Sequence, residues 1–192
     1  ADGSRLTLPA QSRLRVLELK RYSNTELRVS RVSVVTGRIE ALVRKLGTSG
    51  GRFEVDTPTA AIGVRGTDFR AGVGASAAAV RAEVLDGAVG LRSTLRQSDA
   101  EVPVAAGYGA VADAGGKVSA PVPLLGAPNV AQLPRLQERP LVRFQLEPVA
   151  GVAAYRAQAV RAAQPDEVMN EQVAAGNEIR MANLADGDYV LQ

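Results

Sequence analysis

The feature that most constrains the fold of this chain is an alternation of apolar and polar residues with a period of two. It runs through residues 4–112 in short segments, such as Leu6 and Leu8, then Leu14 and Val16. Successive side chains of a β-strand point to opposite faces, so a strand with one buried face has this pattern. The segments are about five residues long and recur at intervals of about 8–12 residues, with no helical pattern between them. This predicts an all-β fold: a sandwich, a barrel or a solenoid of short strands.

Glycine residues mark the starts of several alternating segments. The repeated pattern occurs in "DGSRLTL" at 2–8, "TGRIEAL" at 36–42, "DGAVGLR" at 86–92 and "AGYGAVA" at 106–112. Glycine adopts positive φ without steric cost, which a tight corner between strands requires. The pattern therefore favours a stack of short strands with a solenoid-like or sandwich-like arrangement.

The composition changes at residues 120–140, which contain five prolines. Proline lacks a backbone donor and restricts φ, so this stretch is predicted to be a linker between a first domain at 1–119 and a second at 141–192. In the second, Val142, Phe144 and Leu146 alternate. The alanine-rich stretch 150–175 is interpreted as strands because glycine and proline interrupt it, with a short helix at 165–173 as the alternative.

Composition excludes many kinds of chemistry. The 192 residues include no cysteine and no histidine, which rules out Cys/His zinc sites, histidine-dependent nucleophilic triads and disulfides. We expect no cofactor and no metal. No run of about 18 apolar residues occurs, so we expect no membrane insertion of this chain. It begins and ends within strand-like patterns, and we interpret it as a piece of a longer protein.

Charge is unevenly distributed. Residues 1–56 carry 11 Lys/Arg against 6 Asp/Glu, whereas residues 140–192 carry 4 against 7. The basic side chains of the first strands are a candidate surface for an anionic partner, such as an acidic wall polymer, or charges on solvent-facing strands that discourage edge pairing. These residues are Arg13, Arg15, Lys20, Arg21, Arg28 and Arg31. No nucleic acid is expected, because aromatic residues make up only 4% of the chain and no stacking platform is visible.

The run "TPTAAIGVRGTDF", residues 57–69, combines several unusual choices. Thr57 and Pro58 are typical of a strand end, since proline cannot donate to a ladder. Arg65 is suited to bridging carbonyls or a carboxylate such as Asp68, Glu83 or Asp86. Gly66 supplies a close approach or positive φ, Thr67 and Asp68 bond nearby backbone, and Phe69 anchors the turn in the core. The motif is therefore interpreted as structural rather than as a binding or catalytic site.

The longer run "FEVDTPTAAIGVRGTDF", residues 53–69, resembles the signature of the FecR domain family. The flanks "DGSRLTLPAQSRLRV" and "AEVLDGAVGLRS" are also similar to that family, so the resemblance covers about residues 1–113. Residues 141–192 resemble a small fibronectin-III-like or immunoglobulin-like β module, with Leu146 where a tryptophan is usual and an early end.

The resemblance implies a bacterial cell-envelope protein that is exported to the periplasm, with its signal peptide or anchor outside this chain. One branch of the family relays signals from outer-membrane ferric-siderophore transporters to a sigma factor. Another carries a peptidoglycan-binding LysM module. The trailing module favours the second branch, so the expected function is a non-enzymatic interaction, scaffold or sensor module, with the sigma-factor regulator as the alternative.

The expected partners are an envelope protein, peptidoglycan, or both. Oligomeric state is not indicated by the sequence. An enzyme would have to be built from carboxylate pairs such as Glu83 and Asp86 or Glu18 and Glu26 acting on a glycan, and such pairs have no motif specificity.

Overall fold

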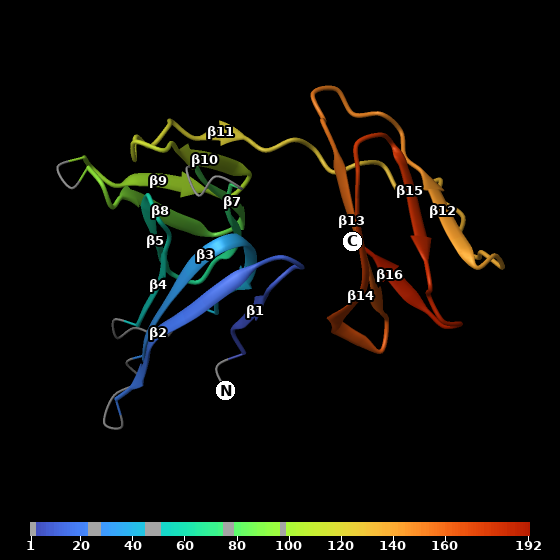
Figure 1. Ribbon diagram of the computed structural model, residues 1–192, viewed down its shortest axis with the longest axis horizontal. Coiled ribbons are helices and arrows are strands. Elements are labelled where there is room, and N and C mark those ends of the chain that lie inside the picture. The colour runs from blue at the N-terminus through green and yellow to red at the C-terminus, as the bar shows by residue number, and fades with distance from the viewer. Residues whose placement is uncertain (1–2, 23–27, 45–50, 75–78, 97–98) are drawn as a thin grey trace. The chain divides into compact units, whose positions relative to one another are not determined.

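The computed structural model describes residues 3–22, 28–44, 51–74, 79–96 and 99–192. The chain forms two compact units, residues 1–124 and 125–192. Every regular element in the described ranges is a β-strand, which confirms the all-β prediction (Figure 1). Within those ranges no helix is long and apolar enough to cross a membrane.

The first unit is a curled, mixed sheet of eleven strands. Its hydrogen-bonded order is β11-β10-β7-β6-β3-β4-β5-β8-β9, and β1 and β2 also pair with β3 (Figure 1). The strands are β1 (Arg5–Thr7), β2 (Arg13–Arg21), β3 (Arg28–Leu42), β4 (Arg52–Asp56), β5 (Ala60–Val64), β6 (Asp68–Val73), β7 (Val80–Asp86), β8 (Ala88–Ser93), β9 (Val102–Ala105), β10 (Tyr108–Ala112) and β11 (Val122–Pro123).

The long strand β3 joins the two halves of this sheet. Its first half pairs with β2 and, in parallel, with β4, whereas its second half pairs with β1 and β6. The buried positions change phase along it, from Val32 and Val34 to Ile39 and Ala41. The change falls at Gly37, where φ is +77° and an added Cβ would lie 2.6 Å from Ser12 Cα. Only glycine fits this bend, which keeps the apolar face of β3 in the core on both sides.

One apolar core serves both halves of the first unit. The largest fully buried side chains in it are Phe69, Ile39, Ile62 and Leu91. The positive φ expected at the glycines is confirmed, because φ is +75° at Gly3, +77° at Gly37, +83° at Gly87 and +81° at Gly107. Gly87 and Gly107 separate consecutive strands as predicted, but the prediction of a strand boundary at Gly37 is wrong, because this glycine bends β3 without ending it.

The second unit consists of a two-stranded sheet, β12-β15, and a three-stranded sheet, β14-β13-β16. Its core contains Leu146, Ala157, Ala159, Ile179 and Met181. The strands are β12 (Leu141–Gln145), β13 (Tyr155–Arg161), β14 (Gln164–Ala174), β15 (Glu178–Ala182) and β16 (Tyr189–Leu191).

The alternative of a short helix at 165–173 is wrong, because β14 covers this stretch. The ladder between β13 and β14 runs from Tyr155 opposite Ala174 to Arg161 opposite Gln164. Pairing along the whole of β13 outweighs the local helix preference of residues such as Glu167, Met169 and Glu171.

The proline-rich segment 120–140 is divided between the two units. Val122 and Pro123 form β11 at the edge of the first sheet, opposite β10. Farther along, Leu133 packs against the core of the second unit, and the Gln137 side chain hydrogen-bonds Arg143 of β12. Proline confines this backbone to edges and extended connections.

Candidate functional site

The Thr57-Pro58 turn connects β4 to β5 and is closed by Thr57. The Thr57 hydroxyl donates to the Ala60 carbonyl at 2.5 Å and accepts from the Ala60 N–H at 3.1 Å. The Thr57 N–H also donates to the Ala60 carbonyl, at 2.9 Å. Pro58, which has no N–H, takes the exposed position between them. These bonds satisfy the backbone of the turn and leave the threonine hydroxyl without a free donor.

The second half of the motif forms a corner between β5 and β6, which we call the motif corner (Arg65, Gly66, Thr67, Asp68 and Phe69). Gly66 has φ of +63°, and the buried Thr67 hydroxyl donates to the Ala88 carbonyl at 2.7 Å. Phe69 is fully buried in the core.

Backbone bonds complete the motif corner. The Thr67 N–H and carbonyl exchange hydrogen bonds of 2.9 Å with the carbonyl and N–H of Val43. At Gly87, an added Cβ would lie 2.7 Å from the Gly66 carbonyl oxygen. Two turns thus meet with their backbones in close contact, and Thr67 joins them.

Arg65 is placed differently from the expectation. Its side chain is exposed and forms no hydrogen bond or ion pair with any residue that the structure describes, so the expected bridge to Asp68, Glu83 or Asp86 is not observed there. The reason is the alternation of β5, in which Ile62 and Val64 enter the core and the next residue points outward.

Asp68 lies in an unfavourable setting for a carboxylate. Burial raises its pKa above the usual value, the negative charges of Asp86 and Glu40 add to the increase, and Arg70 opposes it. Asp68 stands directly opposite Asp86 in the β6–β7 ladder. The fold therefore places two like charges side by side at the motif corner.

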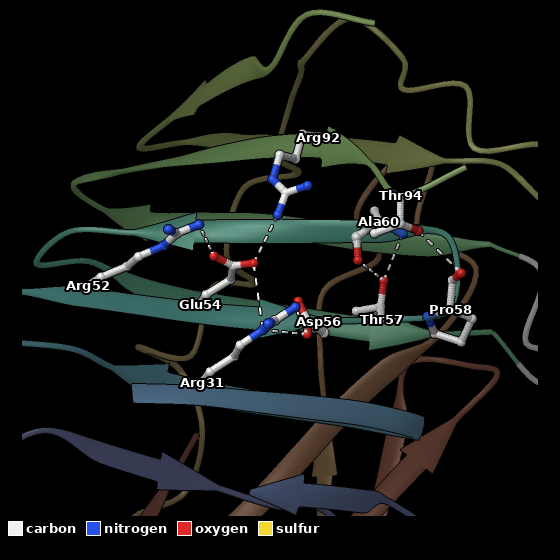
Figure 2. A network of polar contacts seen from close by, with 9 residues as sticks. All are labelled: Arg31, Arg52, Glu54, Asp56, Thr57, Pro58, Ala60, Arg92 and Thr94. Carbon is white, nitrogen blue, oxygen red and sulfur yellow. Dashed lines mark hydrogen bonds and ion pairs between the residues drawn. The ribbon is translucent and has the colours of Figure 1, made fainter. Parts of the chain in front are cut away.

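A second polar group lies on the outer face of the sheet, across β3, β4 and β8. We call it the arginine–carboxylate cluster (Arg31, Arg52, Glu54, Asp56 and Arg92), and Figure 2 shows its side chains converging. The alternation of β4 sends Val55 to the core and turns Glu54 and Asp56 the other way. The parallel register places Arg31 opposite Glu54.

Glu54 is the centre of the cluster. Only 6% of its side chain is exposed, and its two oxygens bind different arginines: Oε1 accepts from Arg92 Nη2 at 2.9 Å and Oε2 pairs with Arg52 Nη2. Arg31 Nε lies 3.9 Å from Oε1. Burial by itself would raise the pKa of Glu54, but the positive charges of Arg52, Arg92 and Arg31 together hold it below the usual value. Glu54 is therefore ionised at neutral pH and is a poor general base.

Arg31 binds the other carboxylate of the cluster. Its Nε and Nη2 both lie 2.7 Å from Asp56 Oδ2 (Figure 2). The hydrogen bond and the charge of Asp56 raise the pKa of Arg31. Glu54 and Asp56 thus fix the positions of three guanidinium groups, and the arginine side chains that carry them are 42–65% exposed.

Two shallow depressions flank the cluster, with volumes of about 210 and 460 Å³. Arg31 and Arg92 line both of them. Next to Glu54, the neighbouring strand presents only Gly63, which is opposite Gly90 of β8. The Glu101 carboxyl group lies over Gly90. This face therefore combines positioned guanidinium donors with two depressions, an arrangement suited to carboxylate or phosphate groups of a partner.

The basic residues singled out in the sequence do not form one site. Arg31 belongs to the cluster, whereas four of the others lie along β2 and Arg28 begins β3. Lys20 is paired with Glu18 at 2.6 Å, and Arg21 is opposite Arg28. Four residues of the cluster were not predicted from the sequence: Arg52, Glu54, Asp56 and Arg92. The charged residues at alternate positions 52, 54 and 56 were the sequence signal that could have indicated this cluster.

The carboxylate pairs considered for catalysis have other surroundings. Glu83 lies 3.9 Å from Arg70 Nη1, and Asp86 is an exposed residue at the end of β7. Glu18 binds Lys20, and Glu26 lies outside the described residues. In the described part of the chain, no group of three or more acidic side chains is placed to hold a metal ion.

The fold and the site define an all-β domain whose sequence motif forms its framework and whose surface carries positioned ion pairs. The family model described as "FecR protein" matches residues 1–90. The FecR resemblance is thereby confirmed over residues 1–90. The second unit lies outside the match, and its likeness to a fibronectin-III module stays a prediction.

Among solved structures, the chain is similar to a protein of Parabacteroides distasonis ATCC 8503 described as a candidate anti-sigma factor, in crystal structures at 1.65 and 2.50 Å resolution. In both, the identity is 16% and the TM-score 0.48, with 64% of this chain and 52% of that chain covered. The chain thus spans about half the length of that protein. No curated protein matches.

Proposed function

We propose that this chain is a non-enzymatic sensor or interaction module of a bacterial cell-envelope protein and that it works in the periplasm. The observation that carries the proposal is the FecR match over residues 1–90. That match supports a sensor or regulator domain, and the trailing β module favours the branch that acts with a peptidoglycan-binding module.

The arginine–carboxylate cluster supports binding rather than catalysis. Its central carboxylate is held ionised by three arginines, so it lacks the pKa near neutrality that a general base needs. Its guanidinium groups are partly exposed and held in place by Glu54 and Asp56. An acidic group of an envelope protein, or a carboxylate of a peptidoglycan stem peptide, suits these donors.

Sedimentation with isolated peptidoglycan sacculi tests the leading partner. We expect the wild-type chain to sediment with sacculi and the double variant Arg52→Gln/Arg92→Gln to remain in the supernatant. The matched control is Arg65→Gln, which removes an exposed arginine outside the cluster and should behave like wild type. An envelope protein is tested separately by cross-linking in cells from a photoreactive residue at position 52.

The second candidate is the signal-receiving domain of a FecR-type sigma-factor regulator in iron-siderophore uptake, which the family match also supports. Deletion of the gene in its own bacterium separates the two functions. Altered transcription of iron-uptake genes favours the regulator. Unchanged transcription together with binding to sacculi favours the scaffold or sensor, and the absence of both effects and of any cross-linked partner would contradict the proposal.

A further inference from the structure

The edge strands of the first unit are not equally protected. Three of them are short or contain proline: β1 has three residues, β9 has four including Pro103, and β11 consists of Val122 and Pro123. These are the usual ways in which proteins prevent an edge from pairing with another chain. The remaining edge strand, β2, has nine residues and no proline.

The outer side of β2 is open. In the described ranges β2 pairs only with β3, and no hydrogen bond reaches the backbone groups on its other side. The edge of β12 in the second unit shows the contrast. There, Gln137 Nε2 donates to the Arg143 carbonyl and Gln137 Oε1 accepts from the Arg143 N–H, both at 3.0 Å. The Gln137 side chain thus occupies the hydrogen-bonding groups of the β12 edge, whereas no side chain among the described residues does so at β2.

Apolar side chains accompany the open edge. Val16 is directly opposite the buried Val32, yet it is 54% exposed, and Leu19 is 69% exposed. Leu17, which lies between them at a bulge, is also exposed. The apolar face of the sheet therefore continues onto β2 beyond the part that the core covers. A strand added beside β2 would bury these side chains.

The positive charge of β2 favours an acidic partner. β2 carries Arg13, Arg15, Lys20 and Arg21 against the single acidic residue Glu18. Pairing of two β2 strands would place like charges opposite one another, which is unfavourable. An acidic strand gains attraction at the same positions.

We propose that β2 accepts by strand addition an extended protein segment in which acidic and apolar residues alternate. This inference rests on the proposed function, in which the chain binds an envelope partner, and it specifies a protein segment of that chemistry rather than a glycan or a second copy. Main-chain hydrogen bonds to β2 supply affinity, whereas Arg15 and Lys20 supply preference for acidic residues.

The test uses the purified 192-residue chain labelled with ¹⁵N and a blocked eight-residue peptide of alternating glutamate and valine. We expect amide shifts and slowed hydrogen exchange at residues 13–21. A peptide methylated on alternate backbone nitrogens, and a peptide of alternating lysine and valine, should each bind at least about tenfold more weakly.

Charge reversal provides the matched variant. Arg15→Glu/Lys20→Glu changes two exposed side chains and should transfer the preference to the lysine-valine peptide. No shift at about 1 mM peptide, shifts centred on Arg31 and Arg92, or equal binding of the methylated peptide would each overturn the inference. Such a failure leaves the binding to sacculi and the cellular tests untouched, so the two proposals fail separately.

Discussion

The motif corner and the arginine–carboxylate cluster are both polar groups of the first unit, but they differ in exposure and in the partners they bind. At the corner, the buried Thr67 binds backbone atoms of Val43 and Ala88. In the cluster, side chains bind side chains, and the arginines remain partly exposed. Buried polar groups bonded to backbone hold turns together, whereas exposed guanidinium groups keep donors for a partner. The most recognisable sequence of the chain therefore marks its framework, and the candidate site lies on neighbouring strands.

The largest expected difference in stability is between variants of two residues of the motif corner, Phe69 and Arg65. Phe69→Ala removes a fully buried ring, and we expect a loss of about 3–5 kcal/mol in the free energy of unfolding. Arg65→Ala removes an exposed side chain and should change it by less than about 0.5 kcal/mol. Urea unfolding of both variants measures this difference. A loss with Arg65→Ala comparable to that with Phe69→Ala would mean that Arg65 is part of the framework.

Thr67→Val tests the hydrogen bonding of the corner without changing its shape. The variant leaves the Ala88 carbonyl without the hydroxyl donor, and we expect a loss of about 1–3 kcal/mol. Thr94→Val is the matched control, because its hydroxyl is at the longer distance of 3.4 Å from the Pro58 carbonyl. Thermal unfolding should show a clear decrease in Tm for the first variant and a small one for the second. Equal decreases would remove the special role of Thr67.

Glu54→Gln tests the electrostatics of the cluster. The variant keeps the shape but removes the charge that holds three arginines, and we expect a loss of about 1 kcal/mol at pH 7 because the arginines are partly exposed. The folded-state pKa of Glu54 is lowered, so its stabilising contribution is present above the unfolded pKa near 4.5 and is lost as pH falls through the folded value. Wild type and variant should therefore converge in acid. A constant difference between pH 7 and pH 3 would assign the loss to packing.

The sequence predicted most of the strands and many of their buried faces because alternation is a local signal, but it was wrong for Leu8 and Val16, which are exposed. It also indicated the glycine corners and the anchoring role of Phe69. The exposure of Arg65 could also have been predicted, because Ile62 and Val64 occupy the buried positions of β5 and the next residue points outward. The motif instead suggested that Arg65 bridges to a carbonyl or a carboxylate. The alternation of apolar and polar residues determines which face of the sheet a side chain lies on, whether or not the residue belongs to a recognisable motif.

The cluster could not be predicted in the same way. Glu54 lies opposite Arg31 only because β3 and β4 pair in parallel. It lies near Arg92 because β5 pairs with β4 on one side and with β8 on the other. Such neighbours depend on the order of strands in the sheet, which hydropathy does not specify. The short helix considered at 165–173 failed for the same reason, because pairing with β13 is a long-range effect.

The smallest expected effect has the opposite sign and concerns Asp68. This carboxylate is partly buried opposite Asp86, and its folded-state pKa is raised, so the fold is favoured when Asp68 is protonated. That contribution is present below the unfolded pKa near 3.8 and is lost as pH rises through the folded value, which leaves a destabilising charge at neutral pH. Asp68→Asn should therefore stabilise the chain by about 0.5 kcal/mol at pH 7, because it removes a partly buried charge that also faces Asp86. The gain should disappear below pH 3.8, and Asp86→Asn should give a smaller gain, because it removes the like charge but leaves Asp68 partly buried. Thermal unfolding from pH 3 to pH 8 measures both variants. A loss of stability with Asp68→Asn at pH 7 would show that this carboxylate stabilises the motif corner through a bond that outweighs the repulsion.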